Sequence, residues 1–304
     1  MKNRSARLVA CSALGLALAT LTGAGRALAE DTPAEGTPPA EATAPPVAAA
    51  PAASSSGGGY LSPTDVTLRQ GAISIDGDVV INLSSGAVGK PVQIVPNLYY
   101  GVNDALTIGF AQNPGAEIFQ TTGSGLCITG SSNGCDHLYN NFSLDGLYSF
   151  MRSSTMDLAG HGGVDFGSLD PFQLSLRAGV KGKLMAGPVM LVFDPFISFG
   201  LNDRSGADAN KEVVALPLRV GIMATPQLNI GASIGFIGPL DGFGDAYSLP
   251  LGVGATFAVS NMVDVRAQFT LTDLTGHSTG SGATGASGGA ADGRAISVGA
   301  AYRM

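Results

Sequence analysis

The chain has no tryptophan, only three cysteines and three histidines, and charged residues at just 13% of its 304 positions. Beyond residue 60 it also lacks any apolar run near the roughly 20 residues that a membrane-spanning helix needs, and it has no amphipathic helical pattern. These absences exclude a helical membrane bundle. The chain instead has 45% hydrophobic residues and 44 glycines. That composition is typical of strands that alternate between lipid and a polar interior.

The N-terminus reads as a secretory signal peptide. Basic residues precede an apolar run from Leu8 to Leu21, and an Ala-Leu-Ala sequence ends at Ala29. We expect residues 1–29 to be removed by cleavage after Ala29. Cys11 lies in a sequence like that of a lipoprotein, but most of the apolar run follows it, so we reject lipidation.

Residues 30–59 contain mainly Pro, Ala, Glu, Thr, Ser and Gly, which predicts a disordered periplasmic tether before a domain at 60–304. Removal of the signal peptide leaves 12 basic against 23 acidic residues, a net charge of −11. Such an acidic chain is a poor partner for nucleic acid. We find no cofactor motif.

A β-hairpin at Val92–Phe110 sets the pattern for the rest of the chain. Its two arms alternate with period 2 around Gly101-Val102-Asn103-Asp104, whose Gly and Asn tolerate the backbone of a tight turn. Similar segments recur to the last residue and predict about twelve strands: Gly71–Leu83, Val92–Gly101, Ala105–Ala111, Asn141–Arg152, Met156–Gly167, Phe172–Ala186, Val189–Gly200, Glu212–Ala224, Leu228–Gly238, Tyr247–Val259, Met262–Leu274 and Arg294–Met304.

One assignment of faces fits all the strands. Apolar residues such as Leu144, Leu176, Ile222 and Val298 share one parity, on which no charge lies mid-strand. A charge there would cost about 2–4 kcal/mol at the centre of a bilayer. The opposite parity carries the side chains that we expect to line a lumen: Asp145, Asp157, His161, Asp165, Arg177, Lys181, Lys183, Asp194, Arg219, Asp264 and Arg266, with Asp76, Asp78 and Arg303 added.

The connections alternate between tight turns and longer loops, of which 112–140 and 275–293 are the longest. Rings on the lipid parity also fall in two groups, one near each end of the strands, as the two interfaces of a membrane favour. Strands in lipid must close to pair their edges. The sequence therefore predicts an all-β fold, a closed antiparallel transmembrane barrel of about twelve strands with both ends of the domain on the periplasmic side.

With its segment Pro-Asn-Leu-Tyr-Tyr-Gly-Val-Asn-Asp-Ala-Leu-Thr-Ile-Gly from Pro96 and its terminal strand Arg294–Met304, the chain resembles bacterial outer-membrane β-barrel proteins of the porin-like class. The resemblance covers about residues 71–304. It implies a location in the outer membrane of a Gram-negative bacterium, contact with lipid, and recognition of the C-terminal strand by the barrel-assembly machinery. The chain ends in Met304 where such proteins end in an aromatic residue, and Tyr302 lies two residues before.

Cys127 and Cys135 lie in the first long loop of an exported chain, and we expect them to form a disulfide. A metal site there would need further ligands, and only Asp136 and His137 are adjacent, so we predict none.

Three functions remain open. A narrow channel would let small polar solutes pass between charges that orient them, whereas a structural or surface-display barrel would hold the same charges as a filled core. An outer-membrane lipid hydrolase would need a nucleophile beside His161, and we find no such motif, so we predict no enzyme.

Overall fold

The computed structural model describes residues 65–83, 90–112, 118–119, 125–135, 137–139, 141–205, 209–241, 247–272, 274 and 293–304. Within these residues no helix has the length and hydropathy needed to cross a membrane. The expected signal peptide, the tether and nearly all of the loop 275–293 lie outside the described residues, as do Cys11 and Asp136.

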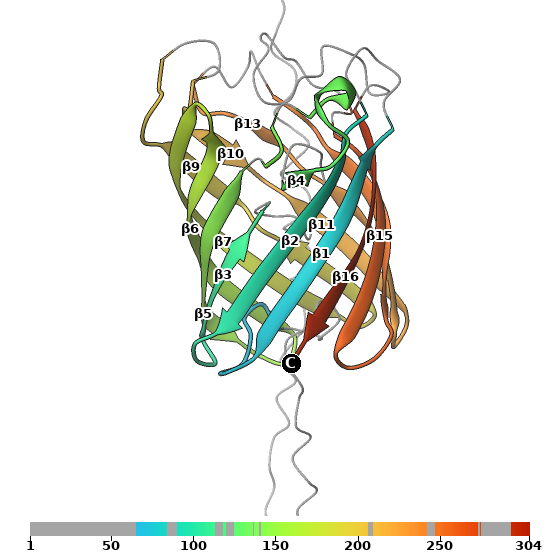
Figure 1. The fold of residues 1–304 in the computed structure, drawn as a ribbon. Helices are drawn as coiled ribbons and strands as arrows, with labels where there is room; N and C mark the ends of the chain where they lie inside the picture. Colours follow the sequence, from blue (N-terminus) through green and yellow to red (C-terminus); the bar gives the residue numbers. More distant parts are fainter. Residues whose placement is uncertain are drawn as a thin grey trace, which may run out of the picture. The chain divides into compact units, whose positions relative to one another are not determined.

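The described strands form one antiparallel sheet that closes where β1 pairs with β16 (Figure 1). Nine residue pairs join these two strands, from Ser74 opposite Arg303 to Asn82 opposite Ala295. Closure leaves no unpaired edge in lipid. The strands are β1 Ile73–Asn82, β2 Val92–Gly101, β3 Leu106–Ala111, β4 Leu126–Cys127, β5 Phe142–Arg152, β6 Met156–Leu169, β7 Phe172–Ala186, β8 Val189–Phe193, β9 Phe196–Gly200, β10 Val213–Ala215, β11 Leu218–Thr225, β12 Leu228–Ile234, β13 Ile237–Pro239, β14 Leu251–Ala258, β15 Val263–Leu271 and β16 Arg294–Arg303.

Three of the predicted strands are interrupted, at Asp194-Pro195, Leu216-Pro217 and Gly235-Phe236. Two of the interruptions contain proline, which has no N–H to donate to the ladder. The register continues across each interruption: Leu218 pairs with Phe193, and Ala215 with Phe196. The pairs β8–β9, β10–β11 and β12–β13 therefore each act as one strand of the wall, and the predicted twelve-stranded closed barrel is confirmed.

The two faces of the wall differ as the alternation predicts. Ile230 is 51% exposed on the outside, whereas its neighbour Asn229 is fully buried on the inside. The outer face carries a row of rings on β3, β5, β6 and the start of β7, near the end with the long loops. Their centroids lie 5.3, 4.4 and 6.2 Å apart in the order Phe110, Phe142, Phe166, Phe172. An apolar outer band with rings at its rim fits a lipid environment.

The third strand of the wall is made of two segments. Continued in register with β2, the strand β3 would place position 115 opposite Gln93, but Cys127 of β4 lies there, twelve residues later. On its other side β4 pairs with residues 138 and 139 through the bridge Leu126–Tyr139. The chain therefore leaves the wall after β3 and returns to it at β4. The predicted long loop 112–140 contains this strand and a short 3-10 helix at Ser131–Asn133.

Candidate channel lumen

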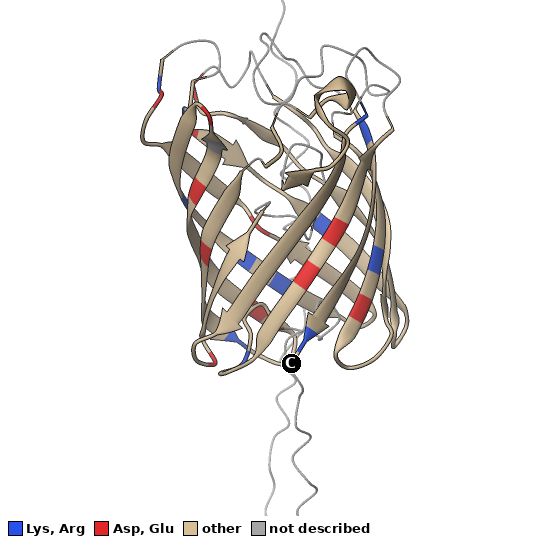
Figure 2. Cartoon of the chain, in the orientation of Figure 1, with Lys and Arg blue, Asp and Glu red and all other residues tan. Residues whose placement is uncertain are grey.

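The barrel places the predicted charged residues on two parts of its wall, one from β5 to β11 and the other on β15, β16 and β1 (Figure 2). Their side chains are buried or half-buried, as expected for the inner face of the wall.

One cluster lies on β5, β6 and β7. Asp145, Gly163 and Arg177 are directly opposite one another on these three strands, and the guanidinium of Arg177 forms an ion pair with Asp145 across the glycine. A Cβ at Gly163 would lie 2.7 Å from atoms of both charged side chains. Arg177 also approaches Asp165 at 3.3 Å and covers the ring of Phe196 at 5.4 Å. The pair therefore lies flat along the wall.

A second row repeats this arrangement at the closing seam. Asp78 on β1, Gly299 on β16 and Arg266 on β15 are opposite one another, and Arg266 Nε donates to Asp78 Oδ1 at 2.7 Å. Arg266 Nη2 also donates to Asp76 Oδ1 at 3.1 Å. Arg303 on β16 pairs with Asp264 on β15. Here too, the partner of each base lies on the same side of the lumen.

His161 on β6 lies between two carboxylates. Its Nδ1 is 2.7 Å from Asp194 Oδ1, and its Nε2 is 3.5 Å from Asp145 Oδ2. Asp145 also pairs with Arg177, so it links His161 to the cluster on β5, β6 and β7. Arg219 on β11 is also buried. Its Nε lies 3.2 Å from the position that a Cβ atom would occupy if Gly231 were replaced by alanine. Both nitrogens of His161 thus face carboxylates inside the barrel.

Asp157 on β6 holds a segment that precedes the barrel. Its carboxylate accepts from Ser149 Oγ at 2.5 Å, from the Val66 N–H at 2.7 Å and from Arg152 Nε at 3.3 Å. Leu68 N donates to Thr107 Oγ1 at 2.7 Å, and the Thr67 and Leu68 side chains are buried. Residues 65–68 therefore lie within the lumen near the end with the short turns.

Two residues of the segment between β3 and β4 also lie inside the barrel. Ile118 and Phe119 are buried in a cluster with Met190 and Val192 of β8, and Gln268 Nε2 of β15 donates to the Ile118 carbonyl at 2.9 Å. This apolar cluster occupies part of the lumen beside β8.

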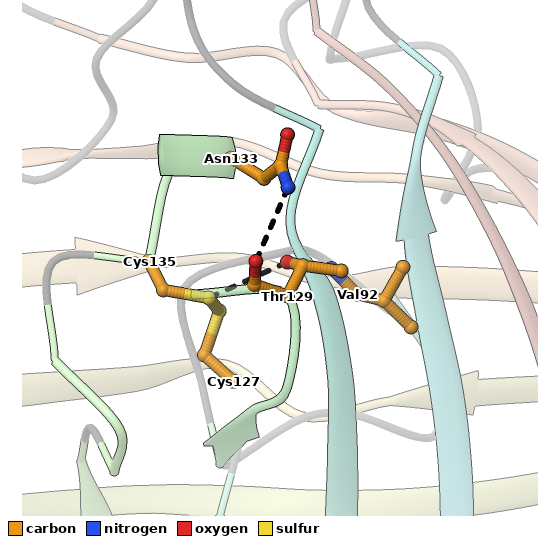
Figure 3. The surroundings of a disulfide bond; sticks show 5 residues. All are labelled: Val92, Cys127, Thr129, Asn133 and Cys135. Atoms are coloured by element: carbon orange, nitrogen blue, oxygen red, sulfur yellow. Dashed lines mark hydrogen bonds between the residues drawn. A yellow bond between two sulfur atoms is a disulfide. The ribbon is translucent and has the colours of Figure 1, made fainter. Parts of the chain in front are cut away.

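The predicted disulfide is present, and it joins β4 to the turn that follows (Figure 3). Cys135 Sγ is 3.4 Å from Thr129 Oγ1, which accepts from the Val92 N–H at 3.1 Å. Asn133 Nδ2 donates to the Thr129 carbonyl at 3.2 Å. These bonds connect the loop to β2 at the point where the chain re-enters the wall.

A cavity of about 70 Å³ remains between the walls. Since one water needs roughly 10–15 Å³ by this measure, it has room for about five to seven waters. Its lining comes from opposite sides of the barrel and from the segment before β1: Asp65, Val66, Leu68, Ser74, Asp76, Tyr99, Thr107, Leu147, Lys181, Lys183, Val192, Arg266 and Arg303.

No family model and no curated protein matches the sequence. Among solved structures, the NanC porin is similar over 76% of this chain and 100% of its own, with a TM-score of 0.51 at 8% identity. An outer-membrane channel of Pseudomonas putida F1 is similar over 78% of this chain and 97% of its own, with a TM-score of 0.52 at 11% identity. The chain has the fold of an outer-membrane porin. At these identities the likeness concerns the fold of the porin and not its solute.

The alternation of the sequence does not predict several parts of the lumen. Ile118 and Phe119 are two bulky residues within a loop rich in Gly, Ser and Thr. Their contrast with the rest of the loop is the sequence signal that could have indicated their buried contact. Gly163 and Gly299 become meaningful only when the register places them between an acid and a base. Val66 and Thr67 precede the barrel, and nothing in their sequence marks them as part of its interior.

Proposed function

We propose that the protein is a narrow outer-membrane channel for passive passage of small polar solutes, with the N-terminal tether in the periplasm. The observation that carries this proposal is the direction in which the ion pairs lie relative to the barrel wall. Asp145 with Arg177, and Asp78 with Arg266, lie along one wall instead of reaching across the barrel. The cavity between opposite walls has charged and polar groups in its lining beside the apolar ones, and these groups can contact a hydrated solute.

Liposome swelling tests this proposal. Liposomes that contain the purified, refolded protein should swell quickly in isotonic glycerol and much more slowly in raffinose, because the space between the walls is small. Protein boiled before reconstitution is the control. Equal swelling rates in glycerol with folded and boiled protein would contradict the proposal.

A structural barrel with a filled core is the second candidate. It is favoured by the burial of Thr67, Leu68, Ile118 and Phe119 within the barrel. The same swelling experiment separates the two, since a filled core admits neither solute. A lipid hydrolase finds less support, because His161 faces Asp145 and Asp194 inside the barrel, where the contacts supply carboxylates and no nucleophile.

We also propose that β16 carries the signal for the barrel-assembly machinery. Tyr302 is 41% exposed on the outer face near the end of this strand, where an assembly factor can reach it before closure. Tyr302→Ala should lower the amount of folded protein in the outer membrane, measured by heat-dependent gel mobility of isolated membranes. Unchanged amounts would contradict this role.

A further inference from the structure

Residues 65–68 lie inside the barrel, several strands away from the strand into which they lead. The chain enters β1 at Ile73, whereas the Val66 N–H donates to Asp157 on β6 at 2.7 Å. In the order of the sheet, β2, β3 and β5 lie between β1 and β6. The segment therefore passes the inner face of these three strands at the end with the short turns.

The strands that the segment passes each supply a contact to it. On β3, Thr107 Oγ1 accepts from the Leu68 N–H at 2.7 Å, and on β5, Arg152 Nη2 donates to Thr67 Oγ1. On β6, the carboxylate that accepts from Val66 belongs to Asp157, which is fully buried. These bonds follow one another from strand to strand, so they fix the course of the segment across the lumen.

Gly101, the last residue of β2, gives the segment room to approach the wall. A Cβ at this position would overlap the Arg69 carbonyl oxygen and would lie 3.1 Å from the Leu68 carbonyl oxygen. The Gly101 carbonyl also accepts from the Gly71 N–H at 2.8 Å. A side chain at Gly101 would push the segment away from β2, so the wall is shaped to hold the segment at this place.

The same segment borders the cavity between the walls. Asp65, Val66 and Leu68 line this cavity together with side chains of β1, β7, β8, β15 and β16. The cavity has room for about five to seven waters, which suits a molecule of the size of glycerol better than a pentose. A solute that moves between the cavity and the end with the short turns therefore has to pass beside residues 65–68.

We infer that residues 65–68, here called the strap, set the upper size of the solutes that pass this end of the channel. The inference rests on the proposed function. Two anchors of the strap are backbone N–H groups, those of Val66 and Leu68. Proline is the residue that lacks this donor, so proline substitutions release the strap and leave every side chain of the wall in place.

Liposome swelling with Val66→Pro and Leu68→Pro combined tests the inference. The rate in arabinose divided by the rate in glycerol should be severalfold higher than for the wild type, because a released strap no longer narrows the passage. This ratio does not depend on the amount of folded protein in the liposomes. Val66→Ile with Leu68→Ile is the matched control, since both N–H groups remain, and it should keep the ratio of the wild type. An unchanged ratio in the proline variant, or an equal rise in the control, overturns the inference.

A change in the wall tests one anchor without altering the strap. Thr107→Val removes the hydroxyl that accepts from Leu68 and nearly keeps the volume of a buried side chain. In NMR hydrogen exchange of the folded protein in detergent, the Leu68 amide should exchange about threefold to tenfold faster, as expected for losing one neutral hydrogen bond. Thr107→Ser keeps the hydroxyl and should restore slow exchange. A Leu68 amide that exchanges equally fast in the wild type and in Thr107→Val overturns the docking of the strap.

The two proposals fail in different ways. Wild-type protein that swells liposomes in glycerol, combined with a proline variant that keeps the wild-type ratio, refutes the role of the strap alone. Wild-type protein that does not swell liposomes in glycerol refutes the proposed channel and, with it, any role of the strap in passage. Heat-dependent gel mobility verifies that each variant is folded before its ratio is measured.

Discussion

Glycines decide how the charged side chains of this barrel lie. Gly163 and Gly299 each occupy the strand between an acid and its base, and in each case a side chain there would collide with the ion pair. Without the glycine, the two charged groups would have to point into the lumen. Breaking a buried pair by removing one partner costs about 3–5 kcal/mol, so these positions also affect stability.

Gly299→Ala should destabilise the barrel by about 1–3 kcal/mol, because the new Cβ would lie 1.9 Å from Asp78 Oδ1 and 2.7 Å from the Gly77 carbonyl. The midpoint of urea unfolding, followed by tryptic resistance in detergent, measures the effect. Gly77→Ala is the matched control on the neighbouring strand, since nothing lies within 4 Å of its Cβ. Equal midpoints for the two variants would contradict this account of Gly299.

The strands show which features of the barrel the alternation of residues predicts and which it does not. Alternation predicted the faces because each side chain follows from the parity of its own strand, as Asn229 and Ile230 illustrate. It did not predict which charges pair, because pairing depends on register across three strands. Nor did it predict β4, since a two-residue strand after an excursion into the lumen has no periodic signal.

Loss of the disulfide should loosen β4 without unfolding the barrel. In the chain-entropy model, closing a loop of this length contributes about 2–3 kcal/mol. In Cys127→Ser with Cys135→Ser, the amides of residues 126–128 should exchange with deuterium faster, while those of β1 and β16 keep their protection. Mass spectrometry of the exported wild type should show the bond. Unchanged exchange at 126–128 would mean that the ladder with β2 alone holds this segment.

Phe119→Ala should raise the conductance of the channel, because the ring is buried inside the barrel beside Gly235 and Pro250 and its loss widens the lumen there. The conductance should rise severalfold where the cluster of Phe119 with Met190 and Val192 forms the narrowest point of the lumen. Phe150→Ala is the control, a ring on the outer face that is 56% exposed. A rise in conductance for the control, or none for Phe119→Ala, would contradict the assignment.

The barrel as a whole combines a wall that the sequence predicts well with an interior that it predicts poorly. Closure and the strand number follow from the alternation and from the need to pair every edge in lipid. The contents of the lumen depend on contacts between distant segments, such as Val66 with Asp157 and Ile118 with Gln268. The width of the lumen therefore follows from the three-dimensional structure and not from the alternation of residues in the sequence.

The most direct test of the channel is the current through single molecules in a planar lipid bilayer. The wild type should give discrete, small conductance steps in potassium chloride, and Arg219→Ala and Arg266→Ala should change the step size or the ratio of cation to anion permeability, because both side chains face the lumen. Heat-dependent gel mobility of the same sample verifies that the barrel is folded. Folded wild-type protein without conductance steps, or steps and permeability ratios that both variants leave unchanged, would contradict the channel and favour a filled structural barrel.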